Sequence, residues 1–201
     1  MMGKLAKMKV LICGMRGLGV ETAKNLILAG PQSVDIFDDE IVRIEDLGAN
    51  FYLREHHVGK VRRDVASLDQ LRELNPYVQV KQVDAHPEHF TNYNLVCITH
   101  TNLSYSTLVD ANQRCRANKT GFILTETLGA AGYIFVDYGD KHIVTDANGE
   151  PCRQFILSGV EQDEKGYVTV HEDKRHSFQD GDFVKFREVE GMTELNDLDP
   201  V

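Results

Sequence analysis

The sequence predicts an α/β domain with a doubly wound, mostly parallel sheet, followed by a small antiparallel β-domain. Three observations support this prediction. Short apolar runs of strand length alternate with stretches of helical periodicity, glycines cluster directly after the first strand, and the last part of the chain has strand patterns without a helix. Strands that alternate with helices imply parallel strands joined by right-handed crossovers. We place the two domains at residues 1–148 and 149–201.

The first elements form a strand, a glycine turn and a helix. Lys9 to Cys13 is an apolar run, and Gly14, Gly17 and Gly19 follow it at the start of a helical pattern. This arrangement is typical of the phosphate-binding unit of Rossmann-like folds. A second strand, Val34 to Phe37, leads to Asp38, near the offset of about 20 residues at which an acid meets a nucleotide ribose. The candidate nucleotide-binding residues are therefore Gly14, Gly17, Gly19 and Asp38.

One residue of the turn departs from the fingerprint G-x-G-x-x-G. Arg16 stands where the second glycine would let the backbone approach a pyrophosphate. We therefore expect the nucleotide site to be vestigial, and we predict no catalytic residue. His100, at the end of a central strand, is expected to be an ordinary hydrogen-bonded loop residue. Cations that could face phosphates are expected to be solvated charges instead, and these are Arg43, Arg54, Lys60, Arg62 and Arg63.

The rest of the first domain continues the alternation. We predict, in order, a helix at Val61–Asn75, strands at Tyr77–Val83 and Asn94–Thr99, a helix at Tyr105–Ala117 and a strand at Gly121–Thr125. The apolar side of the first of these helices is expected to carry Val65, Leu68, Leu71 and Leu74. The crossovers complete a parallel sheet.

The pattern changes near Thr127. We predict a hairpin of strands Tyr133–Val136 and His142–Val144, and a turn at Asn148-Gly149. Three further strands are predicted at Gln154–Val160, Tyr167–His171 and Asp182–Val189. Because a three-stranded piece is marginal alone, the β-domain is expected to be truncated.

Composition excludes several classes of protein. The formal net charge of −9 argues against a nucleic-acid-binding protein, which needs a basic surface. No run of 18 apolar residues indicates a membrane span. The four cysteines, Cys13, Cys97, Cys115 and Cys152, are scattered, and no Cys/His cluster suggests a metal site. A reduced compartment, cytoplasmic and nuclear, is expected.

Runs spread over nearly the whole chain resemble the ubiquitin-activating enzymes. They are CGMRGLGVETAKN at 13–25, FYLREHHVGK at 51–60, LRELNPYV at 71–78, TDANGE at 145–150, RHSFQDGDFV at 175–184 and FREVEGMTELN at 186–196. The resemblance implies an inactive N-terminal adenylation half with a ThiF/MoeB-type fold, followed by the start of the first catalytic-cysteine half-domain.

Departures from the active members of this family fit the inactive half. Arg16 replaces the middle glycine, Asp46 an asparagine, Ala49 an arginine and Arg62 a lysine. No acid occurs in residues 99–103, where active members have a magnesium-binding aspartate. The chain alone is therefore expected to be inactive and to need no cofactor. ATP and Mg²⁺ would bind the other adenylation half.

The resemblance also implies partners and leaves alternatives open. The expected partners are the active adenylation half of the same chain, ubiquitin, and ubiquitin-conjugating enzymes that bind the full-length protein. The chain is expected to be a fragment, with the thioester-forming cysteine beyond Val201. An NAD-dependent oxidoreductase fragment is an alternative, supported by the glycine turn and Asp38. A regulatory interaction module with a dead nucleotide site is another.

Overall fold

The computed structural model describes residues 2–144, 149, 153–163, 165–171 and 176–198. The chain divides into two compact units, Met1–Ala147 and Asn148–Val201. The first residue of the predicted Asn148-Gly149 turn lies outside the described residues, as does Cys152.

A six-stranded sheet in the order β3-β2-β1-β4-β5-β6 forms the centre of the first unit. All neighbouring strands are parallel except β5 and β6, which confirms the predicted α/β fold class. The strands are β1 (Lys9–Cys13), β2 (Ser33–Phe37), β3 (Gln79–Gln82), β4 (Leu95–Ile98), β5 (Gly121–Leu128) and β6 (Ala131–Asp137).

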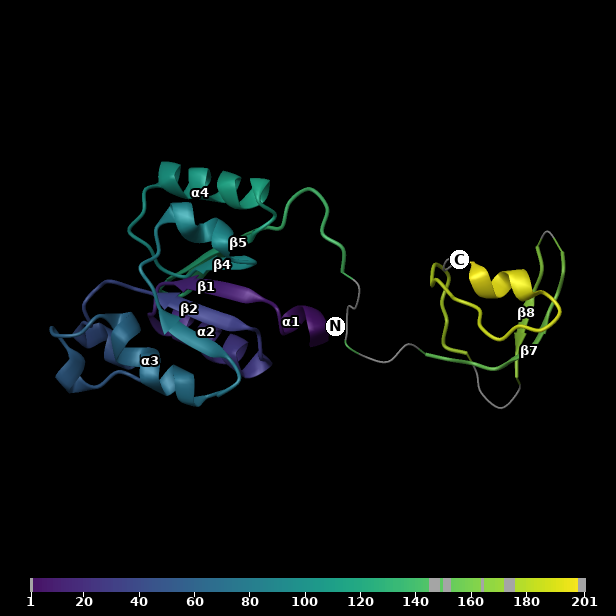
Figure 1. Ribbon diagram of the computed structural model, residues 1–201, viewed down its shortest axis with the longest axis horizontal. Helices are drawn as coiled ribbons and strands as arrows, with labels where there is room; N and C mark the ends of the chain where they lie inside the picture. The colour runs from purple at the N-terminus through teal and green to yellow at the C-terminus, as the bar shows by residue number, and fades with distance from the viewer. Residues whose placement is uncertain (1, 145–148, 150–152, 164, 172–175, 199–201) are drawn as a thin grey trace. The chain divides into compact units, whose positions relative to one another are not determined.

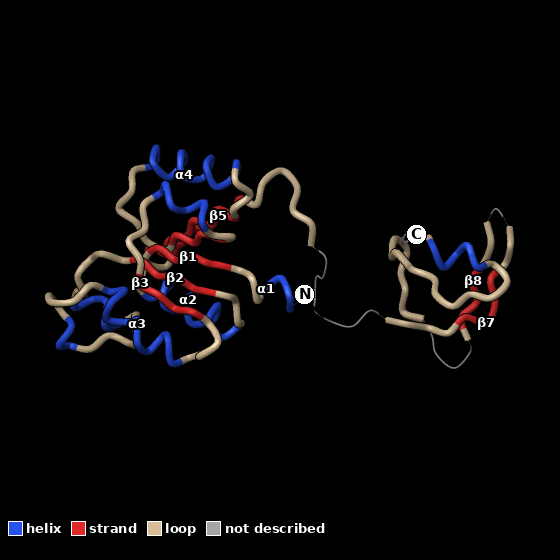
Figure 2. The backbone as a smooth tube through the Cα atoms, in the orientation of Figure 1, coloured by secondary structure: helices blue, strands red, loops and turns tan. Residues whose placement is uncertain are grey.

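Helices cover both faces of this sheet. Figure 1 shows α4 on one face and α2 and α3 on the other, and Figure 2 shows the strands between these two helical layers. The helices are α1 (Met2–Leu5), α2 (Gly17–Ala29), α3 (Arg63–Glu73) and α4 (Tyr105–Ala117), with short 3₁₀ turns η1 (Ile44–Gly48), η2 (Glu55–His57) and η3 (Pro87–Asn92). No helix in the described part of the chain is long and apolar enough to cross a membrane.

The first strand is apolar from Val10 to Cys13 because both of its faces are buried there. Val10 and Ile12 pack in the cluster that contains the buried side chains of α2, whereas Leu11 and Cys13 pack in the cluster of α4 and η3. A strand covered on both faces is expected to be a continuous apolar run. The strand at the centre of the sheet therefore supports both layers.

Helix α3 is shorter than predicted, and its buried face is different. Val65 is 47% exposed, whereas Arg63 and Asp64 are fully buried. Leu71 is buried as expected, and Leu68 and Leu74 pack at the edge of the core. The prediction for Val65 was wrong because ion pairs, and not apolar contacts, orient the first turn of this helix.

The predicted hairpin between Tyr133–Val136 and His142–Val144 was wrong. Strand β6 pairs with β5, from Leu128↔Ala131 to Phe122↔Asp137, and residues 142–144 are not in a strand. Gly129 in the tight turn has φ = 62°, a conformation that glycine adopts without a steric penalty. The tight turn between Leu128 and Ala131 therefore pairs β6 with β5, the strand before it, and not with residues that follow it.

The second unit contains a two-stranded antiparallel sheet of β7 (Leu157–Val160) and β8 (Val168–Val170), together with η4 (Thr193–Asp197). The predicted third strand at Asp182–Val189 does not form. Glu188 has φ = 57°, and the Asn196 side chain bonds both the N–H and the carbonyl of Val189 at 2.9 and 3.1 Å. These bonds engage the backbone groups that a strand partner would use.

Candidate functional site

The candidate site lies where the order of the sheet reverses. Strand β1 lies between β2 and β4. The chain adds β2 and β3 on one side of β1 and then returns to add β4 and β5 on the other side. Ligands of doubly wound sheets bind at such a point, beside the carboxyl ends of the strands. The loops at residues 14–16, after β1, and 99–103, after β4, flank it.

The three glycines of the turn are required by close packing of the chain on itself. A Cβ on Gly19 would lie 1.9 Å from the Gly14 carbonyl oxygen, and one on Gly17 would lie 2.9 Å from the Ala49 Cβ. Gly14 has φ = 96°, and a Cβ there would lie 2.5 Å from the His100 nitrogen. The turn is therefore tight, and its glycines are explained without a ligand.

The Asp38 carboxylate is engaged by groups of the protein. It accepts hydrogen bonds from the Met15 N–H at 2.7 Å, the Glu40 N–H at 3.1 Å and Arg63 Nη1 at 3.3 Å. The residue is only 4% exposed. Burial raises the pKa of Asp38 above its ordinary value, although these hydrogen bonds and the Arg63 charge act in the opposite direction. Both oxygens of the Asp38 carboxylate are therefore engaged by protein groups and covered from solvent.

Arg63 is the largest fully buried side chain of the described residues. Its Nε donates to Asp46 Oδ2 at 2.7 Å, and its Nη1 donates to Glu40 Oε2 at 2.7 Å and lies 3.3 Å from Asp38 Oδ1. Burial alone would lower the pKa of Arg63, but the bonds to Asp46 and Glu40 raise it instead. The prediction that this arginine is a solvated charge was therefore wrong.

Glu40 is the acceptor on which the loops converge. Its carboxylate is reached by Asn102 Nδ2 at 2.6 Å, Arg63 Nη1 at 2.7 Å, Arg16 Nη2 at 3.4 Å, His100 Nε2 at 3.6 Å and Arg43 Nη2 at 3.7 Å. Burial would raise the pKa of Glu40, but the hydrogen bonds from Asn102 and Arg63 outweigh it and lower the pKa to about 2. We call these residues, with Asp38 and Asp46, the Glu40 network.

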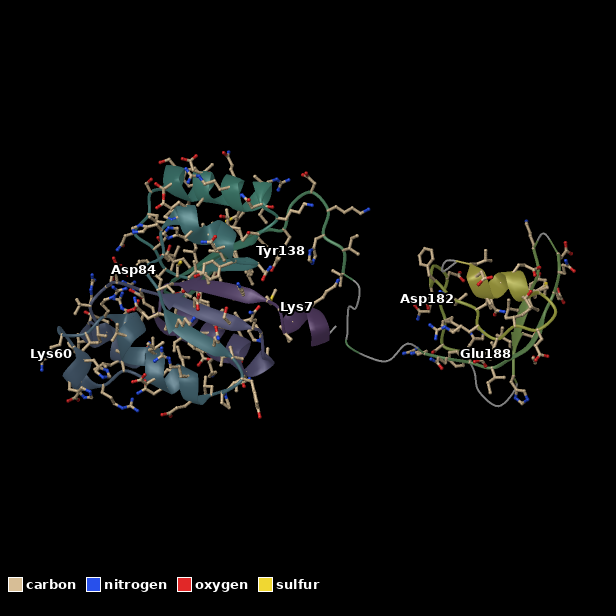
Figure 3. All side chains as sticks on the ribbon, in the orientation of Figure 1. Lys7, Lys60, Asp84, Tyr138, Asp182 and Glu188 are labelled. Atoms are coloured by element: carbon tan, nitrogen blue, oxygen red, sulfur yellow. The ribbon has the colours of Figure 1, made fainter. Side chains whose placement is uncertain are left out.

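The remaining candidate cations also have partners within the chain or face solvent. Arg62 pairs with Asp64 at 2.8 Å and with Asp84 at 3.5 Å. Arg54 donates to the carbonyls of residues 51 and 53. Lys60 is exposed at the edge of the first unit (Figure 3). None of these three points a free charge at the glycine turn.

His100 is a mostly buried loop residue. Its Nδ1 lies 3.6 Å from Glu126 Oε1, on the opposite side of the ring from Glu40. Its backbone N–H bonds the Cys13 carbonyl at 3.3 Å. The predicted hydrogen bonding is thus confirmed for its main chain, and the ring lies between two carboxylates.

The described cysteines offer no nucleophile. Cys13, Cys97 and Cys115 are free and buried, and burial raises the pKa of Cys97 and of Cys115 to about 11. Cys13 lies in β1 and Cys97 in β4, both in buried positions. Among the described residues, no group of His, Cys, Asp and Glu side chains has an arrangement that could hold a metal ion.

Sequence reasoning located the turn but missed Glu40 and the role of Arg63. Glu40 belongs to the acidic run that begins at Asp38, and Arg63 follows Arg62. The ion pair could have been suggested by the acidic run after the second strand and the basic pair at the start of the next helix. Both lie near the carboxyl ends of the strands in a doubly wound sheet.

Comparison with known protein families gives two matches. The ThiF family matches residues 1–169, and the ubiquitin-activating enzyme E1 FCCH domain matches residues 163–201. The chain is also similar to curated proteins over almost all of its length. It is 45% identical over 197 residues to ubiquitin-activating enzyme E1 1 of Candida albicans (strain WO-1). The aligned region covers 98% of this chain and 19% of that protein.

Two further relatives show the same pattern. Ubiquitin-like modifier-activating enzyme 1 of Dictyostelium discoideum is 40% identical over 99% of this chain and 20% of its own length. The Homo sapiens protein of that name is 39% identical over 100% of this chain and 19% of its own length. The chain thus spans about a fifth of the length of these relatives. With a family match over residues 1–169 and the parallel sheet that it implies, the chain belongs to the ThiF family.

Proposed function

We propose that this chain is a non-catalytic portion of a ubiquitin-activating enzyme. In the intact enzyme it supports the ATP-dependent adenylation of the ubiquitin C-terminus and the formation of a thioester, both carried out by other parts of the protein. ATP and Mg²⁺ bind at the active adenylation half. The similarity to ubiquitin-activating enzymes over 98% of the chain supports the parent activity.

The observation that carries the silent role is the Glu40 network. Arg63 is buried beside the carboxyl ends of the strands, where a nucleotide would bind, and Asp38 is covered and bonded by protein groups. Breaking a buried ion pair costs about 3–5 kcal/mol, so a nucleotide would have to disrupt a stable structure to enter. The engagement of Asp38 also removes the support for an NAD-dependent oxidoreductase, which needs that carboxylate for the ribose.

The partner proposed for the first unit is the active adenylation half. Strand β6 is at the edge of the sheet, and it exposes Tyr133, Ile134, Phe135 and Val136. Ile134 is 67% exposed. An apolar strand at a sheet edge is a hazard for association unless a partner covers it. We propose that the active half covers this strand, and that the second unit helps to bind ubiquitin.

Two further parts of the proposal follow from the similarity to the family. Ubiquitin-conjugating enzymes would bind the full-length protein. The protein would work in the cytoplasm and nucleus, which is supported by the free thiols of Cys13, Cys97 and Cys115.

Calorimetry of the chain with Mg²⁺ and ATP tests the silent role. We expect no binding heat, and no exchange of pyrophosphate into ATP. Micromolar, magnesium-dependent binding of ATP would contradict the proposal. Titration of reduced nicotinamide cofactor should likewise leave its fluorescence unchanged.

The docking edge is tested in the complete enzyme. Ile134→Lys is expected to slow formation of the ubiquitin thioester, since it places a charge in the proposed interface. Leu28→Lys is the matched control, because Leu28 is exposed on α2, and it should leave the rate unchanged. Equal rates for the two variants would refute this assignment of the edge.

A further inference from the structure

The donors around Glu40 come from several separate segments. Arg16 is in the loop after β1, His100 and Asn102 are in the loop after β4, and Arg63 begins α3. All of them reach one carboxylate, at distances from 2.6 to 3.6 Å. These loops flank the point where ligands of doubly wound sheets bind. The Glu40 carboxylate therefore lies at the position where this fold holds a ligand.

Three buried nitrogen atoms around Glu40 lack a hydrogen-bond partner in the part of the chain that the structure describes. Arg63 Nη2, Arg16 Nε and His100 Nε2 are buried and have no hydrogen-bond partner among the described residues. The Arg63 side chain is fully buried, so its free nitrogen cannot be satisfied at the protein surface. Unpaired buried donors are uncommon and call for an explanation. An acceptor with more oxygens than a carboxylate would satisfy more of them.

The charges of the network are balanced only with Glu40 in place. Three guanidinium groups, of Arg16, Arg43 and Arg63, face the three carboxylates of Asp38, Glu40 and Asp46. Glu126 adds a partly exposed carboxylate behind His100. Loss of the Glu40 charge alone leaves Arg16 and Arg43 without any carboxylate within ion-pair distance in the described chain. Two arginines left without an acceptor favour a bound oxyanion.

We propose that Glu40 is a built-in occupant of an oxyanion site at the glycine turn, and that this latent site takes phosphate when the carboxylate is removed. The proposal rests on the proposed function, because it names what fills the vestigial nucleotide site. Helix α2 begins at Gly17, directly after Arg16, and the N-terminal end of a helix favours a nearby anion. The preferred ligand is a compact tetrahedral oxyanion, since guanidinium groups match its oxygens.

The test compares the full chain with Glu40→Gln and with Glu45→Gln in titrations with inorganic phosphate at low ionic strength. Glu45 is an exposed acid five residues further on, so its variant loses the same charge outside the network. We expect Glu40→Gln to bind phosphate at least about tenfold more tightly than the other two chains, since hydrogen bonds to charged groups are among the strongest. Adding Arg16→Ala to Glu40→Gln should abolish the gain.

Phosphate rescue gives a second readout if Glu40→Gln folds poorly. Glu40→Ala leaves room for the oxyanion, so phosphate should raise its unfolding temperature, whereas chloride at the same ionic strength should not. Phosphate affinities of Glu40→Gln and Glu45→Gln that agree within error, or no phosphate rescue of Glu40→Ala, would overturn the inference. That outcome is separate from failure of the proposed function, which would appear as ATP binding by the unmodified chain.

Discussion

Replacement of Arg63 is the most informative perturbation of the Glu40 network. Arg63→Ala removes three contacts, to Asp46 at 2.7 Å, to Glu40 at 2.7 Å and to Asp38 at 3.3 Å. It leaves the buried carboxylates of Asp38 and Asp46 without their cation. Removing one member of a buried ion pair costs about 3–5 kcal/mol. Since a domain is stabilised by only about 5–15 kcal/mol, this loss is a large part of the total.

Urea unfolding followed by circular dichroism measures this loss. The chain has no tryptophan, but helices α2, α3 and α4 all lie in the first unit and dominate the helical signal. A loss of about 3–5 kcal/mol corresponds to a fall in the unfolding temperature of roughly 10 °C for a domain of this size. The variant should therefore unfold at a clearly lower urea concentration.

Arg43→Ala is the matched control for Arg63→Ala. Arg43 contacts the same Glu40 carboxylate, but at 3.7 Å and with its side chain 62% exposed. An exposed pair of this kind contributes about 0–1 kcal/mol. Equal effects of the two substitutions, or a loss below about 1 kcal/mol for Arg63→Ala, would refute the conclusion that burial makes this network strong.

Three further predictions follow from the same structure. Gly19→Ala should destabilise the first unit by about 3 kcal/mol or more in urea unfolding, because the new Cβ would lie 1.9 Å from the Gly14 carbonyl oxygen. Gly48→Ala is the control: its Cβ would meet open space, so stability should change by less than about 1 kcal/mol. The pKa of Glu40 falls from 4.5 to about 2 on folding, so its contribution to stability is complete above pH 4.5 and is lost as the pH falls toward 2. Urea unfolding at a series of pH values should therefore show a smaller loss of stability between pH 4.5 and 2 for Glu40→Gln than for the unmodified chain. The same pH dependence in both chains would contradict this prediction. The buried thiols of Cys13, Cys97 and Cys115 have raised pKa values and should resist alkylation by iodoacetamide at pH 8 in the native chain. They should react in urea, and peptide mass spectrometry would detect the modification. Rapid labelling of any of the three in the native chain would contradict their burial.

Local signals were sufficient for much of the fold. The apolar run at Lys9–Cys13 and the glycines after it predict β1 and the start of α2 within a few residues. Helix α4 begins and ends where expected, at Tyr105 and Ala117, because Ser104 caps it by accepting a hydrogen bond from the Thr107 N–H. In these elements, the residues that determine the structure are neighbours in sequence.

The failures occurred where distant residues decide the structure. Val65 was expected to be buried from periodicity, but Arg63 turns that face of α3 toward carboxylates in the segment that follows β2. The partner of β6 depended on which of two turns formed. The candidate site shows the same division, since its glycines follow from a local motif. The ion pair between Glu40 and Arg63 joins residues 23 positions apart, and only the fold brings them together.

The central claim, that protein groups fill the nucleotide position, is tested most directly by nuclear magnetic resonance of the ¹⁵N-labelled chain. Backbone N–H signals of Gly14, Gly17 and Gly19 report on the turn where phosphates would bind. On addition of millimolar Mg²⁺ and ATP, we expect these three signals to keep their positions. Saturable shifts of all three, with those of Arg16 and Met15, would show a nucleotide in the turn and would contradict the account.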